Sequence, residues 1–282
     1  LMKKYMSAIL ALVLYSLAAH AQPKQTKKPK KEGYMRIGIG YNTPTAAQRM
    51  AHNTPLNGTL IYNTNGLADY DLKKASFTAG MQANLAVGIM LNKNIGFELN
   101  NVVGLLPVKY QAGVEYPDNG YTIRELYAKR ATGTFFTIPS LVMQYGNNLQ
   151  LYTSIGVVLP VISRIESSFA YSATFSNTTQ QIKGVEILKH SFNAGVSTAI
   201  GIKGQITKGL NGWVEMNYTS LTLNVKRAEL TEYFVNGQNV LSRVTNPTQQ
   251  YTPSSANANT TLPSIVHPYS SLGLHLGISF TF

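Results

Sequence analysis

Apolar and polar residues alternate with a period of two along eight segments of this chain. The last segment is the clearest, because every second residue from Leu272 to Phe282 is apolar and the residues between them are Gly, His, Ser or Thr. A strand places successive side chains on opposite faces, so this pattern predicts a β-strand with one apolar face. The same reasoning predicts strands over eight ranges: 34–41, 77–91, 95–108, 132–145, 149–161, 192–203, 214–225 and 271–282.

Three of these segments depart from strict alternation. Asn101 interrupts its segment, which predicts a bulge or a change of phase before Val108. Pro139 lies in a segment with apolar residues on both faces, so we expect a kink or a bulge there. A switch of phase predicts a further bulge near Ser220.

The connections between the segments alternate in length. Three-residue turns follow the second, fourth and sixth segments, at 92–94, 146–148 and 207–209. Long polar connections, which we expect to be loops, follow the first, third, fifth and seventh segments, at about 42–76, 111–130, 163–184 and 227–267. This alternation places both ends of the chain on one side, as in an up-and-down antiparallel barrel.

The two faces of the segments indicate the surroundings of the barrel. No run of 18 apolar residues follows the N-terminal segment 1–21, so a transmembrane helix is not expected, and a closed barrel is the other way to satisfy backbone groups in lipid. We therefore predict an all-β fold, an eight-stranded antiparallel up-and-down transmembrane β-barrel with long external loops and short periplasmic turns. The alternative is a soluble sandwich, which would seldom end its chain on a strand such as 271–282.

The N-terminal region has the composition of an export signal. Two Lys precede an apolar run over 5–17 and an Ala-x-Ala site, which predicts a signal peptide over 1–21 that is cleaved after Ala21. Segment 22–33 holds five Lys and one Glu, a local net charge of +4 out of the +12 of the chain, and we expect a basic flexible periplasmic linker. The alternative role of this segment is attraction to anionic headgroups or cell wall. The chain has no Cys, which excludes disulfides and a lipid-anchoring cysteine.

The C-terminal motif Gly277-Ile-Ser-Phe-Thr-Phe282, together with the strand and turn pattern over 34–282, resembles the eight-stranded OmpA-type outer-membrane β-barrel family, particularly its Bacteroidetes-like members. The resemblance implies the outer membrane of a Gram-negative bacterium. It also implies that Phe280 and Phe282 form the assembly signal read by the outer-membrane barrel assembly machinery. Nothing follows Phe282, so a peptidoglycan-binding domain is not expected. A monomer in contact with outer-membrane lipids and lipopolysaccharide is expected, and no nucleic acid.

Strand parity places several polar and charged residues inside the barrel. They are expected at similar depth near the periplasmic end, and they form a predicted lumen charge cluster: Arg36, Glu98, Lys203, Glu215 and His275. Charges in a narrow lumen must be paired, so we expect Arg36 to reach Glu215 and Glu98 to meet a remaining basic group. The alternative is that each group contacts water. Phe280 and Phe282 are expected near the periplasmic rim, whereas Tyr110, Phe136 and Tyr218 are expected as interfacial aromatics toward the outer half.

Sequence motifs for catalysis are weak. Gly38-x-Gly40 lacks the third glycine of a dinucleotide site. Parity places His190 outward at headgroup level, and His52 and His267 lie in predicted loops without metal ligands, so no metal or cofactor is expected. We predict a structural or surface-interaction outer-membrane barrel without catalytic activity and with a plugged lumen, whose external loops meet host or cell-envelope proteins. The alternatives are a small-solute or ion channel, which is porin-like, and an outer-membrane lipid-modifying enzyme.

Overall fold

The computed structural model describes residues 32–45, 57–252, 261–263 and 265–282. The predicted signal peptide, its cleavage after Ala21, His52 and most of the basic linker lie outside these residues. Among the described residues, no helix is long and apolar enough to cross a membrane.

The described residues form seventeen strands and one 3-10 helix. In chain order they are β1 (Glu32–Pro44), β2 (Gly58–Asn63), β3 (Gly66–Leu72), β4 (Gly80–Met90), β5 (Ile95–Pro107), β6 (Lys109–Asp118), β7 (Tyr121–Gly146), β8 (Leu149–Phe175), β9 (Thr178–His190), β10 (Gly195–Thr207), β11 (Leu210–Ser220), β12 (Thr222–Val235), β13 (Gln238–Asn239), η2 (Leu241–Arg243), β14 (Thr248–Thr252), β15 (Thr261–Pro263), β16 (Val266–Pro268) and β17 (Ser271–Thr281).

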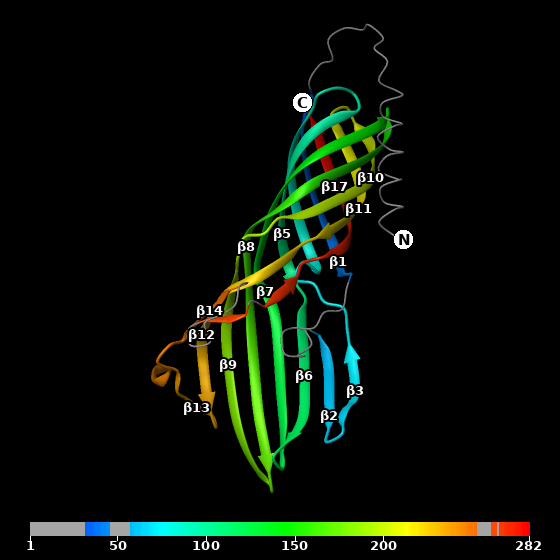
Figure 1. Cartoon of the computed structure of the whole chain (residues 1–282). Helices are drawn as coiled ribbons and strands as arrows, with labels where there is room; N and C mark the ends of the chain where they lie inside the picture. The colour runs from blue at the N-terminus through cyan, green and yellow to red at the C-terminus, as the bar shows by residue number, and fades with distance from the viewer. Residues whose placement is uncertain (1–31, 46–56, 253–260, 264) are drawn as a thin grey trace. The chain divides into compact units, whose positions relative to one another are not determined.

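Eight of these strands close a barrel. Each pairs antiparallel with the next in the order β1, β4, β5, β7, β8, β10, β11, β17, and β17 pairs with β1 to complete the circle (Figure 1). The spatial order equals the chain order, so the predicted eight-stranded up-and-down barrel is confirmed. Short turns at 91–94, 147–148 and 208–209 lie at one end, which we call the short-turn end, and the long connections lie at the opposite end.

The barrel has an apolar outside and a polar inside. Exposed side chains on all eight strands form a largely apolar outer belt, which includes Ile37, Leu85, Phe97, Tyr145, Ile155, Ile200, Val214 and Leu276. Their strand neighbours point inward and are small or polar, as Gly38, Asn84 and Glu98 are. This is the reverse of a soluble barrel, in which the apolar face is buried.

The long connections were expected to be irregular loops, but much of their length forms strands. β7 and β8 are 26 and 27 residues long. Each begins or ends in the barrel wall and continues beyond it into a second group of strands, which we call the extension sheet (Figure 1). In this sheet β6, β7, β8, β9 and β12 pair as antiparallel neighbours, and β2 pairs with β6. The expectation of loops over 111–130 and 163–184 was wrong, because these segments carry polar residues on both faces and give little apolar alternation, although their Thr, Tyr, Val and Ile favour strands.

The extension sheet contains two tight turns that the sequence pattern did not predict. Positive φ angles occur at Asn119 (47°) and Gly120 (80°), and at Asn236 (48°) and Gly237 (82°). Two successive positive φ angles are typical of the type I′ hairpin turn, whose commonest sequence is Asn-Gly. The dipeptides Asn119-Gly120 and Asn236-Gly237 therefore mark hairpins inside segments that were predicted as loops.

Two of the three predicted irregularities are present as register shifts, and the third, near Ser220, is a break between two strands. In the β4–β5 ladder the register shifts between Met81 and Gln82, which leaves Leu105 as the extra residue, whereas Asn101 stays in phase. In the β7–β8 ladder, shifts at Ala131/Gly133 and at Phe135/Phe136 precede Pro139. Near Ser220, the barrel strand β11 ends and β12 leaves for the extension sheet.

Candidate functional site in the barrel lumen

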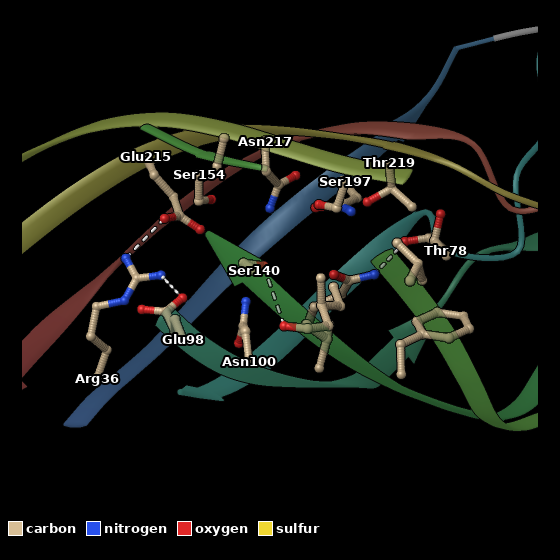
Figure 2. A pocket seen from close by; sticks show the side chains of 17 residues that line it. Arg36, Thr78, Glu98, Asn100, Ser140, Ser154, Ser197, Glu215, Asn217 and Thr219 are labelled. Carbon is tan, nitrogen blue, oxygen red and sulfur yellow. Dashed lines mark hydrogen bonds and ion pairs between the residues drawn. The ribbon is translucent and has the colours of Figure 1, made fainter. Parts of the chain in front are cut away.

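A buried ion cluster lies across the lumen near the short-turn end. Arg36 of β1 reaches two carboxylates on distant strands: its Nη2 lies 2.8 Å from Oε1 of Glu98 on β5, and its Nη1 lies 3.0 Å from Oε2 of Glu215 on β11 (Figure 2). All three residues are buried, with 3–5% of their surface exposed. The ion pair predicted between Arg36 and Glu215 is therefore present, and Arg36 also holds Glu98.

Aromatic side chains complete this ion cluster. Arg36 Nη1 donates to the Tyr152 hydroxyl at 2.8 Å, and that hydroxyl donates to Glu215 at 2.7 Å. The Tyr34 hydroxyl donates to Glu98 at 3.0 Å. The guanidinium carbon of Arg36 lies 4.7 Å from the centroid of the Trp213 ring, within the range of a cation–π contact.

These aromatic residues were not singled out in the sequence, although parity could have found them. Tyr34 shares the inward phase of Arg36, and Tyr152 lies on the polar face of its strand. Glycines make room for the rings, because a Cβ atom at Gly38 would overlap the Trp213 ring and one at Gly88 would overlap Tyr34. Small residues opposite large ones allow a narrow barrel to be filled by its own side chains.

Lys203 was expected to take part in the ion cluster, but it does not. Its Nζ donates to Oε1 of Gln144 at 3.1 Å and lies 5.7 Å from the centroid of the Tyr34 ring. The cause is its place on β10, where Gly201 is the partner of Glu215 and Lys203 lies two residues nearer the short-turn end. The expectation of an ion pair for Lys203 was wrong for the described residues, and the two carboxylates share one Arg.

His275 faces the lumen, as parity predicted, and lies among amides. Its Nε2 is 2.7 Å from Oδ1 of Asn42 and 3.2 Å from Nδ2 of Asn217. A Cβ atom at Gly40 would overlap the imidazole ring, so this glycine provides its space. His275 therefore belongs to a polar layer next to the ion cluster and makes no ion pair with any described residue.

A small polar cavity separates the ion cluster from the opposite end of the lumen. Its volume is about 30 Å³, which is enough for water. Hydroxyl and amide side chains line much of it, including Asn100, Ser140, Ser154, Ser197 and Thr219 (Figure 2). Such a space can hold water but no larger solute.

An apolar cluster fills the lumen beyond this cavity, at the end opposite the short turns. We call it the outer plug; its buried members include Phe77, Val102, Tyr110, Phe136, Ile138, Val158, Leu221, Leu223 and Tyr269. The ring of Tyr269 lies at the centre, with its centroid 5.7 Å from that of Phe77 and 6.0 Å from that of Phe136. The lumen is thus occupied by side chains at two levels, one ionic and one apolar.

Two of the five predicted interfacial aromatics are instead in this plug. Tyr110 is 4% and Phe136 is 3% exposed, so the expectation that they mark a membrane interface was wrong. For Phe136 the reason is the alternation of β7 itself, because Phe136 shares its inward parity with the buried residues Thr134, Ile138 and Val142. Tyr218, Phe280 and Phe282 are exposed, and Phe282 lies at the short-turn end, where its backbone pairs with Gly33.

A buried histidine pair adjoins the outer plug. His190 Nδ1 lies 3.1 Å from the Ser163 carbonyl and therefore donates to it, so His190 Nε2 accepts from His267 Nδ1 at 2.8 Å. The expectation that His190 points outward was wrong, because it packs at 5.6 Å from the Tyr269 ring. Burial lowers the pKa of His190 to about 4 and holds the pKa of His267 well below its usual range, so both rings are neutral at pH 7.

This pair predicts a loss of stability in acid. The lowered pKa of His190 in the folded protein means that the unfolded chain binds more protons as the pH falls from about 6.5 to about 4. The free energy of unfolding should therefore decrease by about 3 kcal/mol over this window on account of His190. Urea unfolding of the wild type and of His190→Gln at pH 7 and pH 4 measures the effect. An equal acid loss in both proteins would contradict it.

The described residues offer little for catalysis or metal binding. Neither His190 nor His275 has a hydrogen bond to a serine hydroxyl, and Ser191 Oγ donates to the Asn224 carbonyl. In the part of the chain that the structure describes, no group of three or more His, Asp or Glu residues could hold a metal ion.

Comparison with known proteins found similar structures only. No protein-family model and no curated protein sequence matches the chain. The outer membrane protein OprG from Pseudomonas aeruginosa has a TM-score of 0.42 and 10% identity over 92% of this chain and 99% of its own. The outer membrane protein AlkL has a TM-score of 0.37 and 11% identity over 93% and 95%. A major outer membrane protein from Thermus thermophilus has a TM-score of 0.37 and 10% identity over 90% and 100%.

These matches are distant. Their TM-scores lie below 0.5 and their identities are 10–11%, so they carry no information about the function of this chain. The resemblance to the OmpA-type family stays a prediction.

Proposed function

We propose that this protein is a closed, non-catalytic barrel of the bacterial outer membrane, whose role is carried by the surface that the extension sheet presents outside the barrel. The observation that carries this proposal is the double closure of the lumen. Arg36 and its two carboxylates fill it near the short-turn end, and the outer plug around Tyr269 fills it at the other end. The space between them has a volume of only about 30 Å³.

The outer belt supports the membrane location. Large apolar side chains such as Ile39, Val87 and Leu274 are half exposed on adjacent strands. Soluble proteins rarely expose a continuous apolar surface of this extent, because its contact with water is unfavourable. In lipid the same surface is stable, and the closed ladder leaves no unpaired strand edge in the barrel.

A channel function would require both closures to move. The ion cluster resists this, because separating Arg36 from Glu98 and Glu215 leaves buried charges uncompensated. An enzyme would require a nucleophile and a base in contact, whereas the imidazoles of His190 and His275 are bonded to a carbonyl, an imidazole or amides. A structural or surface-interaction role therefore fits the described residues best.

Single-channel recording tests the proposal. The refolded wild-type protein, inserted in a planar bilayer, should show no steady ohmic conductance, because no continuous water path passes the ion cluster and the outer plug. The variant Phe136→Ser with Tyr269→Ser, which removes two rings of the plug, provides a comparison for leakage. Steady conductance of the wild type would overturn the proposal in favour of a small-solute or ion channel.

The C-terminal aromatic gives a prediction about assembly. The backbone N–H and carbonyl of Phe282 pair with Gly33, and Phe282 is 78% exposed, so the ring contributes little packing. If the ring is a recognition element, Phe282→Ala should reach the periplasm but accumulate there unfolded, whereas Phe282→Tyr should assemble. Heat-modifiable migration on gels distinguishes folded from unfolded barrels. Normal migration of Phe282→Ala would contradict the prediction.

A further inference from the structure

Basic side chains gather on the outward face of the extension sheet, next to the barrel. They lie on the adjacent strands β6, β7, β8, β9 and β12, and we call them the basic patch: Lys109, Arg130, Arg164, Lys189, Lys226 and Arg227.

The strand register places the patch on one face. Lys109 is directly opposite Arg130, and Lys189 is directly opposite both Arg164 and Arg227, and directly paired residues point the same way. The neighbouring positions Ile165, Leu188 and Ala228 point to the other face and are buried in the hydrophobic core. Lys226 is the extra residue at the register shift between Val225 and Arg227, and its side chain is exposed, whereas Val225 is buried. The basic side chains therefore face the same side as the outer belt of the barrel.

The patch begins where the apolar belt ends. Exposed Ile162 lies two residues before Arg164 on β8, and exposed Phe192 lies three residues after Lys189. At roughly 3.3 Å per residue along a strand, the charges begin about 7–10 Å beyond the last apolar side chains. If the belt is in the membrane, this is the depth of the outer headgroups.

The patch carries unbalanced positive charge. Glu166 pairs with Arg130 at 3.0 Å, and Glu229 pairs with Lys189 at 3.3 Å and with Arg227 at 3.6 Å. The remaining members, Lys109, Arg164 and Lys226, are exposed and make no ion pair with a described residue.

Like charges directly opposite one another destabilise a sheet. The patch contains three such pairs, and Glu229 already lies between the members of one of them, Lys189 and Arg227. In the other two, Lys109 with Arg130 and Arg164 with Lys189, one member makes no ion pair with a described residue. An anion bound between these side chains would remove the repulsion. Phosphate is suited to this, because Arg binds it through two parallel hydrogen bonds and Lys as a point charge.

A groove continues the same face away from the barrel. Its volume is about 470 Å³, and its lining is largely apolar, with Leu126, Ala128, Ala170, Val185 and Phe234 beside the amine of Lys183. An exposed aromatic and aliphatic surface of this size can receive the part of a ligand that extends beyond its phosphate groups.

We propose that the basic patch binds the phosphate groups of a phosphorylated glycolipid in the outer leaflet, with the sugars directed toward the groove. The inference rests on the proposed membrane location and names a partner for the outer surface. A glycolipid is favoured over free phosphate because the patch adjoins the apolar belt, which contacts the acyl chains.

Lipid binding to the folded wild type in detergent micelles tests the proposal, with bisphosphorylated lipid A and its dephosphorylated form as probes. The double variant Arg164→Gln/Lys226→Gln removes two charges without breaking an ion pair, and Lys93→Gln/Lys208→Gln removes two exposed charges at the short-turn end as a matched control. At about fivefold in affinity per charge, the patch variant should bind lipid A about 25-fold more weakly, and the control should bind as the wild type does.

The outcomes separate the alternatives. Equal binding by the patch variant and the wild type, or equal binding of both lipid forms by the wild type, would overturn the proposal. Displacement of lipid A by equimolar inorganic phosphate would show that the patch binds free phosphate, and it would overturn the proposal that the bound phosphate groups belong to a glycolipid. Heat-modifiable migration shows that each variant is folded, and failure of the wild type to insert in vesicles would overturn the membrane location itself.

Discussion

Replacing Arg36 by Met is expected to lower the free energy of unfolding by about 3–5 kcal/mol, because it leaves two buried carboxylates without a counter-charge. Glu98 and Glu215 would keep only the hydroxyls of Tyr34 and Tyr152 as partners among the described residues. Urea unfolding in lipid vesicles measures the loss. The fluorescence of Trp213, the single tryptophan of the chain, reports on the site directly because its ring lies against Arg36.

Two further variants make this test specific. Adding Glu98→Gln and Glu215→Gln to Arg36→Met removes the uncompensated charges and should recover much of the lost stability, as expected if charge and not volume is the cause. Lys203→Met, which removes a lumen cation that has no carboxylate partner among the described residues, should cost less, about 1 kcal/mol for its hydrogen bond to Gln144. An unchanged midpoint for Arg36→Met would show that the ion cluster does not stabilise the barrel.

Tyr269→Ala is expected to cause a loss of similar size, about 3–5 kcal/mol, by leaving a cavity at the centre of the outer plug. The Tyr269 side chain is fully buried, and its ring contacts those of Phe77, Phe136 and His190. Because these residues join the barrel to the extension sheet, the variant should also make β12 and β16 more open to protease. Unfolding in vesicles and limited trypsin digestion measure the two effects.

Tyr218→Ala is the matched control for this prediction. It removes the same side chain from the outward face of β11, where 42% of the residue is exposed, so little packing is lost. We expect a change below about 1 kcal/mol and no new cleavage in the extension sheet. Equal losses for Tyr269→Ala and Tyr218→Ala would show that the outer plug is not a packing centre.

Part of the ion cluster could be predicted because parity in a barrel strand is strict. Once Arg36 was assigned to the polar face of its strand, closure of the barrel brought that strand within one neighbour of the strand with Glu215. The order of contacts within the lumen could not be predicted, because side-chain length and depth decide it. Lys203, two residues nearer the short-turn end than the partner of Glu215, reaches Gln144 instead.

By itself the sequence determined the barrel. Apolar alternation over eight segments, with a short turn after every second segment, predicts an up-and-down barrel, because an antiparallel sheet with one apolar face can be closed in few other ways. The structure has this order of strands: β1, β4, β5, β7, β8, β10, β11 and β17.

Only the tertiary structure decided what lies beyond the barrel. The strands of the extension sheet are held by pairing with distant segments, so polar residues over 163–184 form β8 and β9 without a local apolar signal. Phe136 of β7 packs against the distant Tyr269 in the outer plug, and a hydrogen bond between side chains of β9 and β16 buries His190 against His267. These contacts join residues far apart in the chain, whereas the alternation of apolar and polar residues reports only on which face of its own strand a side chain lies.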